Sequence, residues 1–131
     1  MRLSKEQRKY PRFDIQLAAD IQLPDGKRYN GRTINISGNG VFFEHHSISD
    51  IAHETQCTLT LFVDGNLYSE EIRFNGVLKT HRKNGVGIEF KTMSTNDFIN
   101  FIFLLKKEYP DPEHMISQFS ATPGVQLIEE M

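Results

Sequence analysis

The chain has 131 residues, of which 38% are hydrophobic and 24% are charged, and its formal net charge is −2 at pH 7. This length and composition are typical of one globular domain with its own core. The slightly negative charge disfavours binding of nucleic acid or acidic lipid over the whole surface, so any anion site must be local.

The chain start is polar and basic. Residues 1–7 contain no apolar stretch that could act as a signal peptide. The longest apolar run, residues 101–105, is too short to cross a bilayer. The one cysteine, Cys57, cannot form an internal disulfide. We therefore expect a reduced, cytoplasmic protein that does not insert into membranes.

Strict alternation predicts a first strand over residues 13–23. Hydrophobic side chains occupy every second position there, and mostly polar side chains lie between them. The hydrophobic positions are Phe13, Ile15, Leu17, Ala19, Ile21 and Leu23. Pro24-Asp25-Gly26 follows and supplies the residues that a hairpin turn needs.

Further strands are predicted over about residues 28–37, 41–44, 56–63, 67–81 and 86–90. Asp64-Gly65-Asn66 and Lys83-Asn84-Gly85 accept the positive φ values of tight hairpins. Cys57 belongs to an alternating run, which favours a buried, inert thiol. Six short strands joined by hairpins predict a mainly β fold, either a six-stranded antiparallel barrel or a strongly curled sheet, which removes exposed edges.

The pattern changes to a helix after the last strand. Ser94 can cap this helix, and Asp97 favours its first turn. The apolar stripe comprises Phe98, Phe101, Ile102 and Leu105, and it is widened by Ile99, Phe103 and Leu104. Packing against an open end of the barrel is favoured over a self-association surface, and a homodimer is left open.

Pro110-Asp111-Pro112 ends the predicted helix. A further short turn or helix is expected from Asp111, with Met115, Ile116 and Phe119 facing inward. The remaining residues carry no clear pattern.

The segment Asn35-Ile36-Ser37-Gly38-Asn39-Gly40 ends the second predicted strand. With the isoleucines at 34 and 36 facing the core, Asn35 and Ser37 face the opposite side, about 6–7 Å apart along the strand. Gly38 and Gly40 bracket a tight turn at which the backbone can approach a ligand. Alone, the segment reads as an ordinary turn, because turns favour these residue types.

A basic segment, Arg8-Lys9-Tyr10-Pro11-Arg12, precedes the first strand. Pro11 biases the residue before it toward extended backbone, so that Arg8 and Arg12 can close round one object. The guanidinium fork matches phosphate and the O6/N7 edge of guanine. Together the two segments are suited to a compact dianion that carries purine edges.

Arg8-x-x-x-Arg12 followed by Asn35-x-Ser37-x-x-Gly40 resembles the paired signature of PilZ domains, the bacterial receptors for cyclic di-GMP. Residues 85–90, Gly-Val-Gly-Ile-Glu-Phe, resemble the glycine-rich final strand of that family. The helix that follows matches its usual ending. The resemblance covers about residues 6 to 108 and implies a PilZ-like split barrel with a C-terminal helix.

The resemblance also implies a role for each motif residue. Arg8 and Arg12 would hold phosphates and a guanine O6/N7 edge. Asn35 and Ser37 would bond another guanine edge or a phosphate oxygen, and Gly40 would keep the turn that aims them.

Three further residues, Gln7, Lys9 and Gly38, are secondary candidates for ligand contact. Asn35 stands where many family members have aspartate, so its bonds to guanine would differ. Gln7 stands where a further arginine is associated with binding a stacked ligand pair. The number of ligands bound is therefore left open.

The implied organisation has a flexible ligand-binding segment at residues 1–12, the barrel with its helix at 13–108, and an extension at 109–131. Ligand binding would order the first segment over the barrel and present a new surface to an unidentified effector protein. Cyclic di-GMP is the only ligand implied, with no cofactor and no enzymatic activity.

Other functions are disfavoured. His45, His46 and His53 lack the regular spacing of a metal site, and Asp14 and Asp20 are too far apart for a catalytic carboxylate pair. A small barrel that binds single-stranded nucleic acid would need aromatic residues interleaved with a basic groove. A PilZ-like adaptor that has lost nucleotide binding remains the main alternative.

Overall fold

The computed structural model describes residues 14–37, 39–45, 54–64, 69–108 and 126–128. In chain order, these residues form β1 (Ala18–Gln22), β2 (Arg28–Ser37), β3 (Gly40–Glu44), β4 (Gln56–Asp64), β5 (Ser69–Arg82), β6 (Gly85–Ser94), α1 (Thr95–Glu108) and β7 (Gln126–Ile128). Within this part of the chain, no helix is long and apolar enough to span a membrane.

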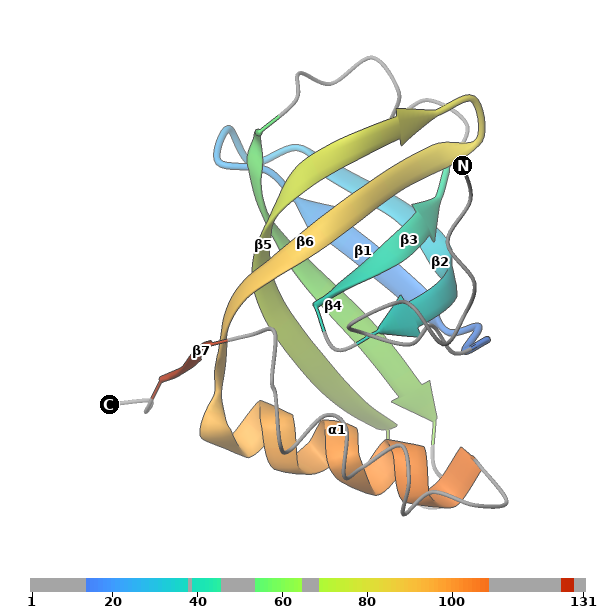
Figure 1. Ribbon diagram of the computed structural model, residues 1–131, viewed down its shortest axis with the longest axis vertical. Helices are drawn as coiled ribbons and strands as arrows, with labels where there is room; N and C mark the ends of the chain where they lie inside the picture. Colours follow the sequence, from blue (N-terminus) through green and yellow to red (C-terminus); the bar gives the residue numbers. More distant parts are fainter. Residues whose placement is uncertain (1–13, 38, 46–53, 65–68, 109–125, 129–131) are drawn as a thin grey trace, which may run out of the picture.

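The first six strands form a closed antiparallel barrel (Figure 1). Their order is β3-β2-β1-β4-β5-β6, and β3 also pairs with β6, which closes the ring. Inward-facing side chains from all six strands fill the interior, among them the fully buried Ile21, Phe43, Leu59 and Leu78. The predicted six-stranded barrel is therefore confirmed.

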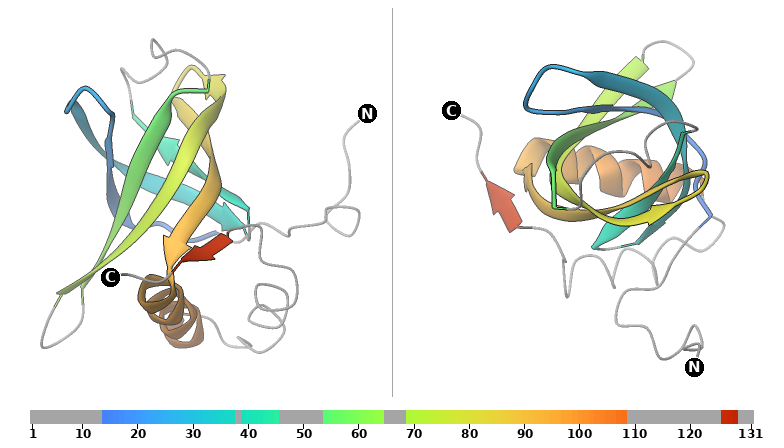
Figure 2. Two further views of the ribbon diagram at one scale, coloured as in Figure 1. Left: turned by 90° about the vertical axis from the view of Figure 1, so that its left-hand side faces the viewer. Right: turned by 90° about the horizontal axis from the view of Figure 1, so that it is seen from above.

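Helix α1 closes one end of the barrel, as predicted (Figures 1 and 2). Ser94 caps it, because its Oγ accepts from the Asp97 amide at 3.0 Å and donates to the Asp97 carboxylate at 2.9 Å. Phe101 is buried with its ring edge-on to Phe74, the two centroids 5.4 Å apart. The widened stripe is only partly used: Leu104 is buried, but two other stripe residues stay exposed, Ile99 at 46% and Phe103 at 61%.

Strand β7 is an element that the sequence analysis did not predict. It pairs in parallel with the end of β6, from Thr92↔Gln126 to Ser94↔Ile128. Three exposed residues are too few to show a period. The turn or helix expected from Asp111 lies outside the described residues, as does the turn expected at Gly65-Asn66.

Cys57 is buried in the barrel wall, as the alternation predicts. Burial raises the pKa of its thiol from 9.0 to about 12. Since the folded chain holds this proton more tightly, the thiol favours folding below pH 9, and that contribution falls as the pH rises from 9 toward 12. We expect a thiol-specific disulfide reagent at pH 8 to modify Cys57 only after unfolding in guanidinium. Rapid modification of the folded chain would contradict this burial.

Candidate functional site

The strand register places Asn35 and Ser37 on the outer face of the barrel. Ile36 pairs with Val41, which pairs with Ile88, and all three are buried. Because side chains alternate along a strand, the neighbouring positions face outward. Asn35, Ser37 and Gly40 are called the polar shelf below; Ser37 pairs with Gly40, and Asn35 pairs with Phe42.

The inner residues of β2 differ from the prediction at one position. Ile34 was expected to face the core beside Ile36, but the fully buried residue is Thr33. The register passes from Thr33↔Phe43 to Asn35↔Phe42, so Ile34 is the extra residue of a β-bulge. The bulge lets Thr33 face inward and still leaves Asn35 facing outward.

Ser37 is held in place by Asn39. Its Oγ donates to the Asn39 Oδ1 at 2.7 Å and accepts from the Asn39 amide at 3.4 Å, and Ser37 is only 6% exposed. The Asn39 carbonyl in turn accepts from the Phe90 amide at 2.8 Å, which ties the β2–β3 connection to β6. Asn39, which the sequence analysis did not single out, therefore orients the shelf hydroxyl. The signal for it would have been an amide two residues after the serine.

Gly40 is required by close packing rather than by a left-handed turn. Its φ is not among the positive values of the described residues. A Cβ at Gly40 would lie 2.5 Å from the Ile88 carbonyl oxygen, a backbone atom of β6. This finding changes the reason for the glycine, which the sequence analysis attributed to the turn.

We expect Gly40→Ala to destabilise the barrel by about 1–3 kcal/mol, because the new methyl group forces β3 and β6 apart. Chemical denaturation followed by circular dichroism measures the loss. Gly87→Ala is a suitable control, since the nearest atom to its Cβ would be a Thr80 side-chain atom at 3.3 Å, and the nearest backbone atom, the Thr80 carbonyl oxygen, would lie at 3.8 Å. Equal stability of the two variants would contradict this interpretation.

Residues 15–17 lie against β2 and are fixed there by Thr33. The Leu17 amide donates to the Thr33 Oγ1 at 3.0 Å, and that hydroxyl donates to the Ile15 carbonyl at 2.6 Å. The Thr33 amide donates to the Leu17 carbonyl at 2.9 Å. This contact is called the Thr33 clasp below. It explains why β1 begins at Ala18 instead of at residue 13: the preceding residues are bound by a side chain instead of a full strand ladder.

The predicted basic residues, together with Gln7 and Gly38, lie outside the described residues. Covalent geometry nevertheless limits the Cα of Arg12 to about 11 Å from that of Ile15, and the Cα of Arg8 to about 25 Å. Ile15 is bonded to Thr33, which lies two residues before Asn35 on β2. The Cα of Arg12 can therefore lie no more than about 11 Å from a residue that is bonded to β2, whereas Arg8 has a much wider reach.

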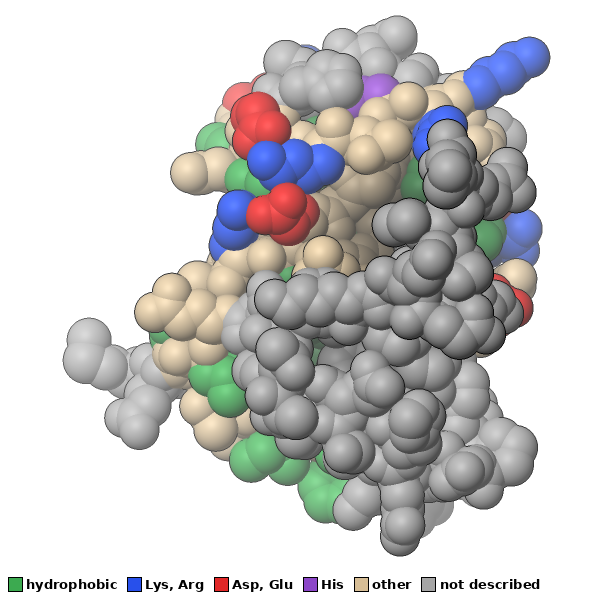
Figure 3. Space-filling model, viewed as in Figure 1, with side chains coloured by type: hydrophobic (Ala, Val, Ile, Leu, Met, Phe, Trp, Pro, Cys, Tyr) green, Lys and Arg blue, Asp and Glu red, His purple; other side chains and the backbone are tan. Residues whose placement is uncertain are grey.

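A network of four charged side chains lies next to the shelf. Lys79 is on β5, Glu89 and Lys91 are on β6, and Glu54 lies two residues before β4. Glu89 binds Lys91 at 2.6 Å and approaches Lys79 at 3.9 Å, and Lys79 also binds Glu54 at 2.8 Å. The hydrogen bond from Lys91 lowers the pKa of Glu89, and the hydrogen bond to Glu54 raises the pKa of Lys79. Figure 3 shows basic and acidic side chains gathered at the upper left of the face of the molecule that it presents. Glu54, Lys79, Glu89 and Lys91 are called the ion-pair network.

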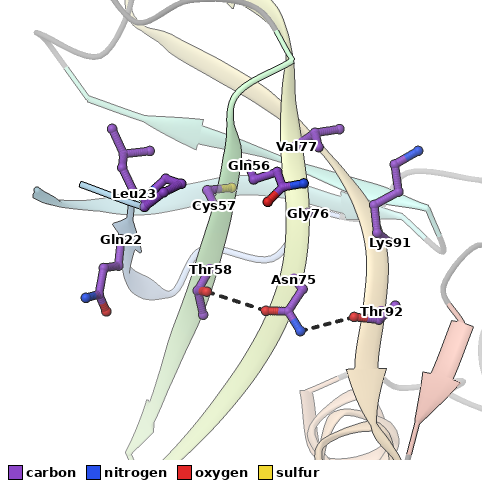
Figure 4. Close-up of a pocket in the computed structure, with 11 residues that line it drawn as sticks. Gln22, Leu23, Gln56, Cys57, Thr58, Asn75, Gly76, Val77, Lys91 and Thr92 are labelled. Carbon is purple, nitrogen blue, oxygen red and sulfur yellow. Dashed lines mark hydrogen bonds between the residues drawn. The ribbon is translucent and has the colours of Figure 1, made fainter. Parts of the chain in front are cut away.

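A separate groove of about 570 Å³ lies where the β1–β2 hairpin meets β4, β5 and β6 (Figure 4). Asn75 lies at its centre, accepting from Thr58 at 3.4 Å and donating to Thr92 at 3.1 Å. Lys91 belongs both to this groove and to the ion-pair network. None of the described shelf residues lines the groove, so it is not the site that the sequence predicted.

His45, one of the three predicted loop histidines, packs in an aromatic cluster. Its ring stacks on Phe43 at 6.2 Å and meets Tyr29 edge-on at 5.3 Å between centroids. His46 and His53 lie outside the described residues.

Comparison with known proteins points to one family. The model of the PilZ domain matches residues 6–105. Among solved structures, the chain is similar to the Bacillus subtilis inhibitor of motility (MotI/DgrA), with 17% identity and a TM-score of 0.56 over 79% of this chain. It is also similar to the PilZ domain of CeSA from a cellulose-synthesizing bacterium, with 17% identity and a TM-score of 0.57 over 75% of this chain.

The shares of the two structures that are covered differ. The chain spans 98% of the CeSA PilZ domain but only 54% of MotI/DgrA. At this identity the two structures establish the fold alone. No match was found among curated proteins.

Proposed function

Because the chain belongs to the PilZ domain family, a family of cyclic di-GMP receptors that are generally non-catalytic, we propose that it binds cyclic di-GMP at the polar shelf. Residues 1–12 are the second half of this site, with Arg8 and Arg12 on the phosphates and on a guanine O6/N7 edge. Gln7, Lys9 and Gly38 are secondary contacts.

The Thr33 clasp is the observation that carries this proposal. It holds Ile15 and Leu17, which follow the basic segment in the chain, against Thr33 of β2, the strand that presents the shelf. The two signatures are 23 residues apart between Arg12 and Asn35, yet the clasp brings their flanking residues into hydrogen-bond contact. A site divided between two such segments can enclose a compact ligand that neither segment could bind alone.

The hydrogen bonds already present define what the shelf offers to a ligand. A hydroxyl has one proton, and the Ser37 proton is directed to Asn39. Ser37 therefore offers a lone pair to a guanine N–H while that bond persists. The Asn35 amide both donates and accepts, so it suits a guanine edge that carries both kinds of group.

The proposed output is a change of surface. Neutralising Arg8 and Arg12 with a dianion would allow residues 1–12 to fold over the shelf, and the covered shelf would then be read by a partner protein in the cytoplasm. The partner in this proposal is a separate protein of unidentified type.

Isothermal titration calorimetry with cyclic di-GMP and with GMP tests this function. The proposal predicts saturable binding of cyclic di-GMP and much weaker binding of GMP, which lacks the second phosphate and the second guanine. If cyclic di-GMP gave no saturable heat in low salt, the adaptor without a nucleotide would be the better assignment.

A further inference from the structure

The ion-pair network lies on the same outer row of the barrel as the polar shelf. Ser37 pairs with Gly40, and Gly40 pairs with Glu89. Directly opposed residues in an antiparallel pair point to the same face. Because Gly40 has no side chain, no side chain stands between Ser37 and Glu89 in this row.

Both lysines of the network lie at irregular positions of the β5–β6 ladder. The register passes from Asn75↔Thr92 to Gly76↔Phe90, which leaves Lys91 as the extra residue on β6. It then passes from Leu78↔Ile88 to Thr80↔Gly87, which leaves Lys79 as the extra residue on β5. Bulges redirect the side chain that they carry: Lys91 binds Glu89 at 2.6 Å, and Lys79 binds Glu54 at 2.8 Å and approaches Glu89 at 3.9 Å.

Lys91 is also linked through the backbone to the shelf. It directly follows Phe90, whose amide donates to the Asn39 carbonyl at 2.8 Å. Asn39 is the residue that binds the Ser37 hydroxyl. A phosphate bound at the shelf would be repelled by the Glu89 carboxylate, which holds the Lys91 ammonium group at 2.6 Å.

We propose that Glu89 is a built-in competitor for the phosphates of the ligand, and that Lys91, with Lys79 behind it, is a latent cationic contact that Glu89 holds until the ligand arrives. This inference rests on the proposed function and adds affinity-setting residues outside the signature motifs. Binding would exchange the Glu89–Lys91 pair for a phosphate–Lys91 pair, so the ligand must displace an internal anion.

The pair of variants Glu89→Gln and Lys91→Met tests the exchange by calorimetry with cyclic di-GMP. Glu89→Gln should tighten binding about two- to fivefold, the range expected of one exposed charge interaction. Lys91→Met should weaken it about two- to fivefold, because one exposed charge contact is lost. Both differences should shrink at high salt, and in the double variant the gain from Glu89→Gln should fall.

Glu71→Gln is the matched control. Glu71 forms a 2.6 Å ion pair with Arg73 on β5, so this variant makes the same charge change in a similar exposed pair. It lies six residues from Val77 along the strand, a distance of about 20 Å, and Val77 is the β5 partner of Glu89. Equal tightening by Glu71→Gln and Glu89→Gln would show a general charge effect and overturn the inference.

Two further outcomes separate this inference from the proposed function. If the wild type binds and Arg12→Ala weakens binding, but Glu89→Gln changes nothing, the competitor role is wrong and the receptor function stands. If neither the wild type nor Glu89→Gln binds cyclic di-GMP, the receptor function is wrong and the competitor role falls with it.

Discussion

Arg12→Ala is expected to weaken binding of cyclic di-GMP about 10- to 150-fold. Charge-assisted hydrogen bonds contribute about 1.5–3 kcal/mol each, and each 1.4 kcal/mol corresponds to a tenfold change in affinity. Covalent geometry keeps the Cα of Arg12 within about 11 Å of Ile15, which the Thr33 clasp binds, so Arg12 has the shorter reach of the two predicted arginines. Titration calorimetry at constant salt measures the effect.

Arg28→Ala is the control for charge alone. Arg28 is exposed on β2 and contacts Gln22 at 3.3 Å, and it lies seven residues from Asn35. It should bind like the wild type. Arg12→Lys should recover only part of the affinity, because an ammonium lacks the planar fork. Wild-type affinity in both Arg8→Ala and Arg12→Ala would show that the basic segment is not part of the site.

Thr33→Val is expected to lower both folding stability and ligand affinity. The valine has nearly the same shape but leaves the buried Ile15 carbonyl without its 2.6 Å partner, at a cost of about 1–3 kcal/mol. At roughly 4 °C per kcal/mol for a chain of this length, the melting temperature should fall by about 4–12 °C. Affinity should also fall, because the basic segment loses its attachment beside the shelf.

Thr33→Ser separates the effect of the hydroxyl group from the effect of the methyl group. It keeps the donor and acceptor of the clasp, so its affinity should stay near that of the wild type even if its stability drops slightly. Thermal unfolding and calorimetry on the same samples measure both quantities. A Thr33→Val protein with normal stability and normal affinity would mean that the clasp has no role in either.

Most of the barrel could be predicted from local patterns. Alternation over β1 and β4, together with the turn at Asp25-Gly26, predicts strands and hairpins because period and turn chemistry are local properties. The helix followed from its cap, since Ser94 and Asp97 are close in sequence and do bond as expected. The predicted bounds of β2 are the bounds observed.

The bulge at Ile34 could not be predicted in the same way. A bulge is a property of two strands in register. The contacts that favour this one are made by Thr33 to Leu17 and Ile15, which lie 16 and 18 residues before it in the sequence. From the alternation pattern alone, a threonine in a strand is expected to face outward. Its inward position becomes visible only when the partner backbone is present to receive the hydroxyl proton.

The candidate site, too, could be predicted only in part. Asn35 and Ser37 were predicted to share the outer face, and the register agrees. Asn39 and Glu89 were not singled out, because their importance comes from neighbours on β2 and β3. Glu89 is 49 positions from Gly40 in sequence, a separation at which only the closed barrel makes them adjacent.

Amide NMR spectra recorded during a titration with cyclic di-GMP test the two-part site most directly. The account predicts that the amides of Asn35, Asn39 and Gly40 shift together with those of residues 8–12, and that both groups saturate at the same ligand concentration. Shifts confined to the groove around Asn75, or shelf shifts that leave residues 8–12 unchanged, would contradict it.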